Sequence, residues 1–196
     1  MPPRSLRPHA GLLPRWVRAF REQHPRVDLE LIEATGDVQL QAFERGEIDA
    51  GFMLHSPGFA PSGLERALIA SEPFLLAVPE SHPLAAAASP ARSKVLAEPL
   101  VIFPRRIVPS LYDAIFAMYH AAGRSPQVAQ EAIQMQTIVN LVSAGLGLAW
   151  VPESVRQFQR PGVVYKTVGA GKSDAKVPGC ETSLVWSKSH CSPVLS

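Results

Sequence analysis

The sequence has few of the features that mark specialised classes of protein. Only 2 cysteines occur among 196 residues, Cys180 and Cys191, and they show neither Cys-x-x-Cys nor histidine spacing. Two thiols are too few for a disulfide framework, so we expect ordinary reduced cysteines, in keeping with the cytosol. No apolar run approaches the ~20 residues of a membrane span. The start of the chain also lacks the apolar core of about 7–15 residues that a secretory signal needs.

The chain also has no large excess of positive or negative charge. Lys and Arg number 19 and Asp and Glu 17, so the net charge is only +2, and no long basic run occurs. A balance so close to neutral argues against a nucleic-acid-binding surface. With 46% hydrophobic and 18% charged residues, the composition is that of a globular protein with one large or two small domains.

Catalytic and metal-binding patterns are missing from the sequence. There is no Gly-x-Ser-x-Gly nucleophile elbow. The 6 histidines have no partner four residues away and no flanking ligand pattern. The carboxylates of Glu30, Glu33, Glu47 and Asp49 look like ordinary surface charges. We therefore expect no catalytic residue, no metal and no cofactor, which argues against an enzyme.

One apolar stretch, "VNLVSAGLGLAWVP" at residues 139–152, contains a Gly-x-Gly that raises the question of a nucleotide loop. The preceding residues Met135, Ile138, Val139 and Val142 share one face of a helix, and Gly145 follows at the position of a left-handed helix cap. The order is thus helix, glycine, strand, which is the reverse of a dinucleotide-binding loop. The glycines are predicted to be structural, and residues 146–152 to form a strand buried on both faces.

Hydrophobic periodicity predicts alternating helices and strands along the rest of the chain. The predicted helices cover residues 11–23, 36–45, 109–122, 135–144 and, as a short piece, 154–159. The predicted strands cover 27–34, 48–54, 64–70, 72–79, 99–104, 127–132, 146–152, 163–168 and 182–187. The strand–helix–strand units indicate an α/β fold with parallel sheets. We predict a first lobe of residues 1–71 plus 161–196 and a second of 72–160, with hinge crossings near Ser71–Glu72 and Arg160–Gly162.

A ligand cleft is expected between these lobes, because ligands of such sheets bind beyond the carboxyl ends of the strands. Four helices are predicted to begin there, near Ala10–Gly11, Thr35–Gly36, Val108–Pro109 and Gln134–Met135. Their free N–H groups and positive dipole ends suit an anion, and Thr35 adds a hydroxyl.

Several side chains near this predicted cleft allow two interpretations each. Arg105 and Arg106 lie in the turn "FPRRIVPS", where one of them can hold a carboxylate with two hydrogen bonds, or both can be solvated. Gln136 can reach a ligand or cap its helix. Phe103 can form a cleft wall or belong to the core, and the core is the commoner position for phenylalanine.

Five motifs in order resemble the effector-binding domain of LysR-type transcriptional regulators: "GLLPRWVRAFREQHPRVDLEL", "FERGEIDAGFM", "EPFLLAVPESHPLA", "LAEPLVIFPR" and "IVNLVSAGLGLAWVP". The resemblance covers residues 10–195. It implies an α/β fold like that of type 2 periplasmic binding proteins, with two lobes, mixed sheets and flanking helices. It also implies a cleft for a small effector, often an aromatic or short-chain carboxylate. The positions that match the family's cleft are Ala10, Gly11, Thr35, Gly36, Phe103, Pro104, Arg105 and Gln136.

The resemblance further implies a homodimer or tetramer formed through helices 12–22 and 111–122, in the cytoplasm and without a membrane partner. Family members bind DNA through a winged helix-turn-helix and a linker helix, neither of which is recognisable here, so this chain alone is not expected to bind DNA. At two places the sequence departs from the family pattern. "MPPRSLRPHA", with three prolines, stands where the family has its first strand, and "SPVLS" stands where members begin a last helix.

Two other classes of function remain as alternatives. A stand-alone solute-binding protein of the same fold would need a signal peptide, and none is seen. An enzyme on this fold would need a charged catalytic cluster in the cleft, and none is evident.

Overall fold

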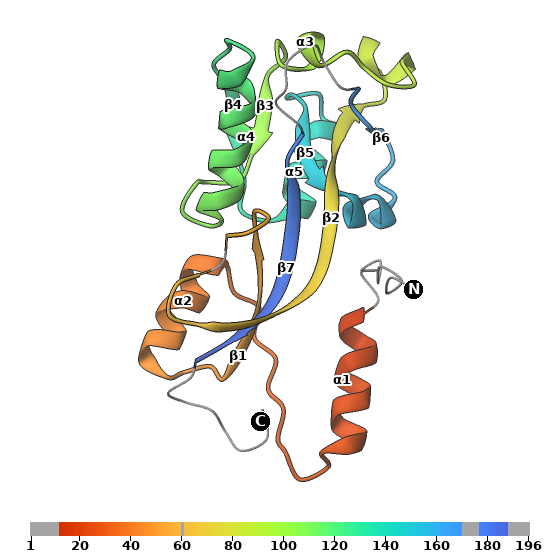
Figure 1. Ribbon diagram of the computed structural model, residues 1–196. Helices are drawn as coiled ribbons and strands as arrows, with labels where there is room; N and C mark the ends of the chain where they lie inside the picture. Colours follow the sequence, from red (N-terminus) through yellow and green to blue (C-terminus); the bar gives the residue numbers. More distant parts are fainter. Residues whose placement is uncertain (1–11, 60, 170–176, 188–196) are drawn as a thin grey trace, which may run out of the picture.

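The computed structural model describes residues 12–59, 61–169 and 177–187. It shows two α/β lobes joined by two long strands, β2 (Glu65–Pro79) and β7 (Gly179–Trp186) (Figure 1). The first lobe contains α1 (Leu12–Gln23), α2 (Gly36–Arg45) and β1 (Ala50–His55). The second lobe contains η1 (Pro83–Ala86), α3 (Arg92–Val95), β3 (Leu100–Ile102), α4 (Pro109–Ala121), β4 (Val128–Glu131), α5 (Met135–Ser143), β5 (Ala149–Pro152), η2 (Glu153–Phe158) and β6 (Val163–Lys166).

The strand β2 serves both lobes. Its first part pairs antiparallel with β7 as far as Pro73, and from Phe74 onward it pairs with β5 and β6 instead. The sequence predicted two strands here, 64–70 and 72–79, but they form one strand with an irregularity between Leu68 and Ala70. Pro73 is tolerated inside this strand because it stands where β2 changes partner, next to the crossing predicted at Ser71–Glu72.

The main hydrophobic core lies in the second lobe. It includes the fully shielded side chains of Leu76, Ile115, Val142 and Val151. The strands β3 and β4 pair in parallel, and the crossover helix α4 lies between them in the sequence. This confirms the strand–helix–strand unit predicted for this region. All four residues of β5 are buried, which confirms the predicted buried strand for residues 149–152, whereas Leu146, at the start of the predicted range, is 40% exposed and precedes the strand.

The glycines that follow α5 are structural, as predicted. Gly145 has a φ of 80°, the left-handed conformation that ends a helix. At Gly147 a Cβ would lie 2.6 Å from the carbonyl oxygen of Pro99, so the backbones approach too closely for any side chain. The stretch is therefore a helix end followed by a buried strand.

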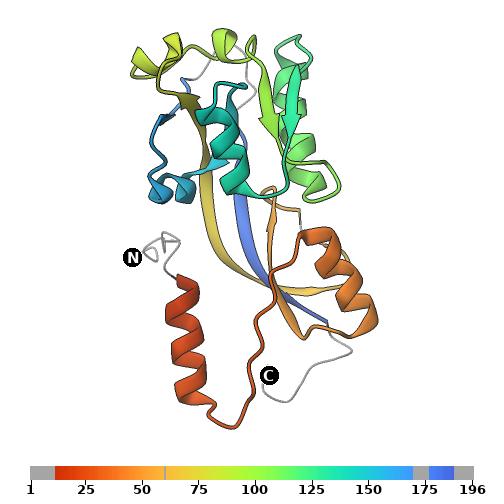
Figure 2. The same ribbon diagram turned by 180° about the vertical axis from the view of Figure 1, so that it is seen from behind.

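The prediction of a strand at residues 27–34 is wrong. The segment lies in no strand of the described range 12–59, and Leu31 and Ile32 are 62% and 65% exposed. Figure 2 shows it running beside α1 and away from the sheet. The strand β1 pairs antiparallel with β7, and on its other edge the carbonyl of Phe52 accepts a hydrogen bond of 3.3 Å from the Gln39 side chain. Without a neighbour for residues 27–34, the expected parallel unit does not form in the first lobe.

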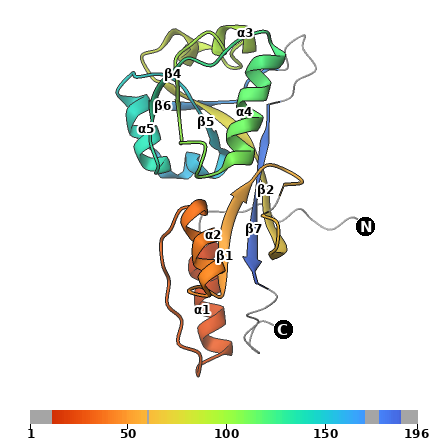
Figure 3. The same ribbon diagram turned by 90° about the vertical axis from the view of Figure 1, so that its left-hand side faces the viewer.

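The placement of β6 also differs from the expected lobe division. The strand pairs with residues 76–79 of β2, so residues 163–166 lie in the second lobe rather than the first. The chain returns to the first lobe with β7, and not at the crossing predicted near Arg160–Gly162. Figure 3 shows the lobes in profile, with β2 and β7 running between them. The remaining boundaries of the two lobes, and residues 1–11 with the expected loss of the first strand, stay predictions.

Candidate functional site

The two lobes meet where α2 begins and where the loop of residues 103–108 leads into α4. A Cβ added at Gly36 would lie 2.6 Å from the carbonyl oxygen of Ile107, so the first residue of α2 lies against that loop. Beside it, Arg106 Nε lies 3.4 Å from Asp37 Oδ2, an exposed ion pair between the lobes. The structure therefore brings the predicted positions Thr35 and Gly36 to the loop that carries Phe103, Pro104 and Arg105.

The N-terminus of α2 already has a carboxylate of its own. The Thr35 hydroxyl donates a hydrogen bond to Asp37 Oδ1 and does not cap the helix. This hydrogen bond, together with the backbone N–H groups of Asp37 and Val38 and the charge of Arg106, lowers the pKa of Asp37. Asp37 is thus a fixed negative charge at the helix end predicted to receive an anion.

Both arginines of the loop are exposed, but each is paired with an aspartate. The Arg105 guanidinium donates two parallel hydrogen bonds of 2.7 Å to Asp113 on α4. This contact lowers the pKa of Asp113 and raises that of Arg105. The fork geometry is the one that an arginine uses to bind a free carboxylate. Neither of the two interpretations of these side chains anticipated the pairs with Asp113 and Asp37.

The other predicted site residues have different surroundings. Phe103 is 6% exposed and belongs to the core of the second lobe, where its ring meets Tyr112 edge-on at 6.3 Å. Pro104 is buried beside it, and Gln136 is exposed in the first turn of α5. Ala10 and Gly11 lie outside the described residues.

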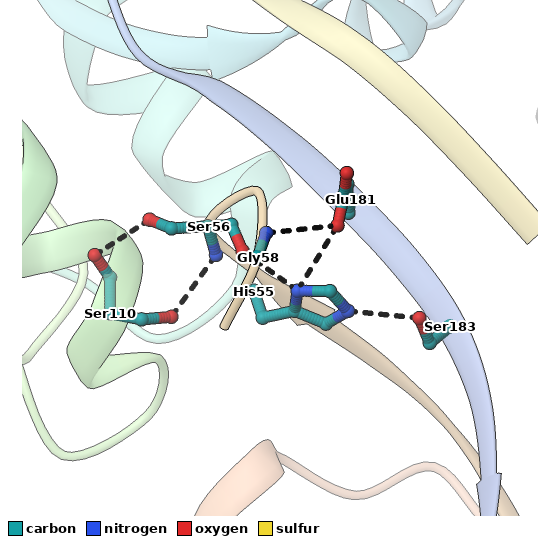
Figure 4. Close-up of polar contacts among 6 residues, drawn as sticks. All are labelled: His55, Ser56, Gly58, Ser110, Glu181 and Ser183. Atoms are coloured by element: carbon teal, nitrogen blue, oxygen red, sulfur yellow. Dashed lines mark hydrogen bonds and ion pairs between the residues drawn. The ribbon is translucent and has the colours of Figure 1, made fainter. Parts of the chain in front are cut away.

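A second polar network at the junction was not anticipated. The N–H of Ser56, just after β1, donates to Ser110 Oγ in the first turn of α4 at 3.1 Å, and Ser56 Oγ donates to the Ser110 carbonyl at 2.7 Å. The His55 ring lies behind Ser56 and contacts Glu181 and Ser183 of β7 (Figure 4). The sequence gives only a weak signal for it, the polar "HSP" directly after an apolar strand.

Residues 12–59, 61–169 and 177–187 contain neither a candidate metal centre nor a membrane-spanning helix. Among the residues placed by the structure, no group of three or more His, Cys, Asp or Glu side chains is arranged to hold a metal ion. No helix in these ranges is long and apolar enough to span a bilayer. Two hollows of about 550 and 500 Å³ lie along α1, where they are lined by residues 21, 24–29 and by residues 14, 17, 18, 21 and 22.

Comparison with curated proteins finds relatives among transcriptional regulators. The HTH-type transcriptional regulator IlvR of Caulobacter vibrioides is 39% identical over 187 residues, which are 94% of this chain and 60% of IlvR. The chain therefore spans about three fifths of the length of this relative.

Solved structures agree with this relationship. The effector-binding domain of BenM with its effector benzoate has a TM-score of 0.72 and 25% identity, covering 94% of this chain and 81% of that domain. Full-length CbnR in complex with its target DNA has a TM-score of 0.71 and 26% identity, covering 93% of this chain and 62% of CbnR. The two-lobed fold expected from the sequence is confirmed.

The family model that matches is the LysR substrate binding domain, and it matches residues 8–195. This is a family of ligand-binding regulatory domains, and the related proteins are regulators, so the expectation that the chain is not an enzyme is confirmed. The chain belongs to the LysR substrate-binding domain family.

Proposed function

We propose that this domain senses a small organic carboxylate, aromatic or short-chain, which binds where the two lobes meet. The main support is the loop of residues 103–108, whose two arginines each already hold a carboxylate at this junction. A guanidinium that forms a two-bonded contact with Asp113 has the right geometry for the carboxylate of a ligand. The relative BenM was solved with benzoate, which agrees with this ligand class.

In the proposed complex the effector carboxylate displaces Asp113 from Arg105. The residues that contact it are Thr35, Gly36, Phe103, Pro104, Arg105 and Gln136, with Ala10 and Gly11. Because Asp37 already supplies a negative charge to the start of α2, the effector carboxylate is expected on the Arg105 side, and the apolar part of the effector on the Gly36 side. The aromatic ring of Phe103, held edge-on by Tyr112, limits the depth of the site.

We propose that the domain works within a longer cytoplasmic regulator that binds DNA through a helix-turn-helix. Its oligomers form through the helices at residues 12–22 and 111–122. In support, the apolar side chains Trp16, Val17 and Phe20 of α1 are only half-buried and belong to neither hydrophobic core. Trp16 stacks on Phe52 of β1 with ring centroids 5.7 Å apart, which leaves much of the apolar stripe for a second copy. The relatives are regulators, which favours this reading over a stand-alone solute-binding protein.

The effector site is tested by isothermal titration calorimetry with benzoate and a series of short dicarboxylates. Arg105→Ala should weaken binding of the acid that the native protein prefers, by tenfold for each ~1.4 kcal/mol lost. Arg124→Ala is the matched control, because Arg124 is exposed and follows the far end of α4, away from the loop of residues 103–108. Equal affinities for the native protein and the Arg105 variant would remove Arg105 from the site. If none of these acids bound, the proposed ligand class would be wrong.

A further inference from the structure

The network around Ser56 links three elements through residues that the effector proposal does not use. Ser56 follows β1 in the first lobe, Ser110 lies in the first turn of α4 in the second lobe, and β7 connects the lobes (Figure 4). We infer that Ser56 and Ser110, braced by His55, form an interlobe latch that holds the two lobes together whether or not an effector is bound. This inference does not depend on the identity of the ligand.

The latch consists of two hydrogen bonds between the same two residues, both donated by Ser56 and both accepted by Ser110. The Ser56 N–H reaches Ser110 Oγ at 3.1 Å, and the Ser56 hydroxyl reaches the Ser110 carbonyl at 2.7 Å. Ser56 is only 5% exposed and Ser110 is half-buried, so water has little access to these two hydrogen bonds while the lobes are together. Opening the lobes would exchange both for hydrogen bonds to water, at the modest net cost of a typical intramolecular hydrogen bond for each.

His55 fixes the position of Ser56 from inside the first lobe. Its Nδ1 lies 2.8 Å from the Ser56 carbonyl oxygen, and its Nε2 lies 2.9 Å from Ser183 Oγ. A carbonyl oxygen can only accept, so Nδ1 carries a hydrogen and donates it to the Ser56 carbonyl, while Nε2 and the Ser183 hydroxyl share the second hydrogen bond. The ring is 3% exposed and Ser183 is fully shielded, so this arrangement is rigidly enclosed.

The brace also ties the latch to the strand that joins the lobes. Both Ser183 and Glu181 belong to β7, and Glu181 Oε2 lies 3.7 Å from His55 Nδ1 and accepts a 3.4 Å hydrogen bond from the Gly58 N–H. Ser56 therefore cannot follow Ser110 away from the first lobe without disturbing β7. A movement of α4 relative to β1 would therefore be transmitted to the connecting strand through these contacts.

We expect the latch to contribute more than the Arg106–Asp37 ion pair, another polar contact between the lobes. The Arg106–Asp37 pair is 3.4 Å long, and the Arg106 side chain is 62% exposed. Exposed ion pairs of this kind contribute little, because solvent screens them and both side chains must be ordered. Loss of Ser56 and Ser110 hydroxyls should therefore loosen the lobes, whereas loss of the Arg106 pair should not.

The latch is tested by measuring the distance between spin labels on the two lobes with pulsed electron paramagnetic resonance. Labels are placed at Glu44→Cys on α2 and Asn140→Cys on α5, both exposed, in a Cys191→Ser background; Cys180 is buried and stays. The double variant Ser56→Ala with Ser110→Ala should broaden the distance distribution and shift it to longer values. His55→Phe, which keeps a ring but loses both hydrogen bonds, should do the same.

Ser93→Ala, an exposed serine on α3, is the matched control and should leave the distribution unchanged. A double variant with the native distribution would overturn the latch. The amide of Ser56 gives a second readout that does not require the double variant to fold. In the native protein this amide should be protected from hydrogen exchange, and Ser110→Ala should speed its exchange by about tenfold or more. An unprotected Ser56 amide in the native protein would also refute the latch.

Discussion

Substitution of Gly36 by alanine tests whether the two lobes can move apart as rigid bodies. The backbone of Gly36 does not need glycine, since its φ is not positive, so the only obstacle is the Ile107 carbonyl 2.6 Å from the new Cβ. Ordinary contact begins at 3.4 Å, so the loop must retreat by about 0.8 Å. If the second lobe retreats as a rigid body, the 3.1 Å hydrogen bond from the Ser56 N–H to Ser110 is lost, and the 2.7 Å bond is stretched to its limit.

The matched comparison is Gly147→Ala, which meets the Pro99 carbonyl at the same 2.6 Å but within one lobe. There the two backbones are joined by the hydrogen bond from the Leu148 N–H to Pro99, 2.8 Å long, so the clash cannot be relieved by a hinge. Overpacking of this kind costs about 1–3 kcal/mol. In a chain of this size each kcal/mol lowers the Tm by roughly 2–4 °C.

We therefore expect Gly147→Ala to lower the Tm by several degrees. Gly36→Ala should stay within about 1 kcal/mol of the native protein, because the loss of one hydrogen bond is partly offset by the better helix propensity of alanine. Calorimetric melting gives the stability, and exchange of the Ser56 amide reports the opening. Equal destabilisation by the two variants would mean that the lobes are one rigid unit. If the Ser56 amide exchanged at its native rate in the Gly36→Ala variant, the close approach of Gly36 to the Ile107 carbonyl would be refuted.

Two further predictions concern titrating groups. In a Cys191→Ser variant the remaining thiol, Cys180, should not react with Ellman's reagent until urea unfolds the chain. The reason is that the Cys180 side chain is fully shielded and burial raises the pKa of its thiol. Rapid reaction of the folded protein would contradict the position of β7. The carboxyl groups of Asp37 and Asp113 should titrate below their ordinary pKa of 3.8. Their contribution to the free energy of unfolding is therefore fully present above pH 3.8 and is lost as the pH falls through the lowered pKa values of the folded protein. Carbon-13 NMR should show Thr35→Val raising the pKa of Asp37 while that of Asp113 stays constant, and an unchanged Asp37 would exclude the Thr35 hydroxyl as the main cause.

Local patterns predicted the elements that depend on local contacts. The helix at residues 135–143 and its left-handed Gly145 follow from spacing and backbone freedom, both of which are visible in a short window. The strand prediction for residues 27–34 was wrong because alternation of apolar and polar residues shows that a segment suits a strand, but not that a neighbouring strand exists to pair with it. The Ser56–Ser110 contact joins residues 54 apart, and neither serine differs from an ordinary turn or helix-start residue until the lobes are brought together.

The pairing of β1 has a consequence for the order in which the protein assembles during synthesis. The only strand paired with β1 in the described chain is β7, which the ribosome makes more than a hundred residues later. The second lobe can build its core from residues that are close in sequence, whereas the first lobe must keep an open strand edge until the end of the chain emerges. Of the two lobes, the one whose strand β1 is made earlier is thus completed later, and Gly179–Trp186 is the segment that closes it.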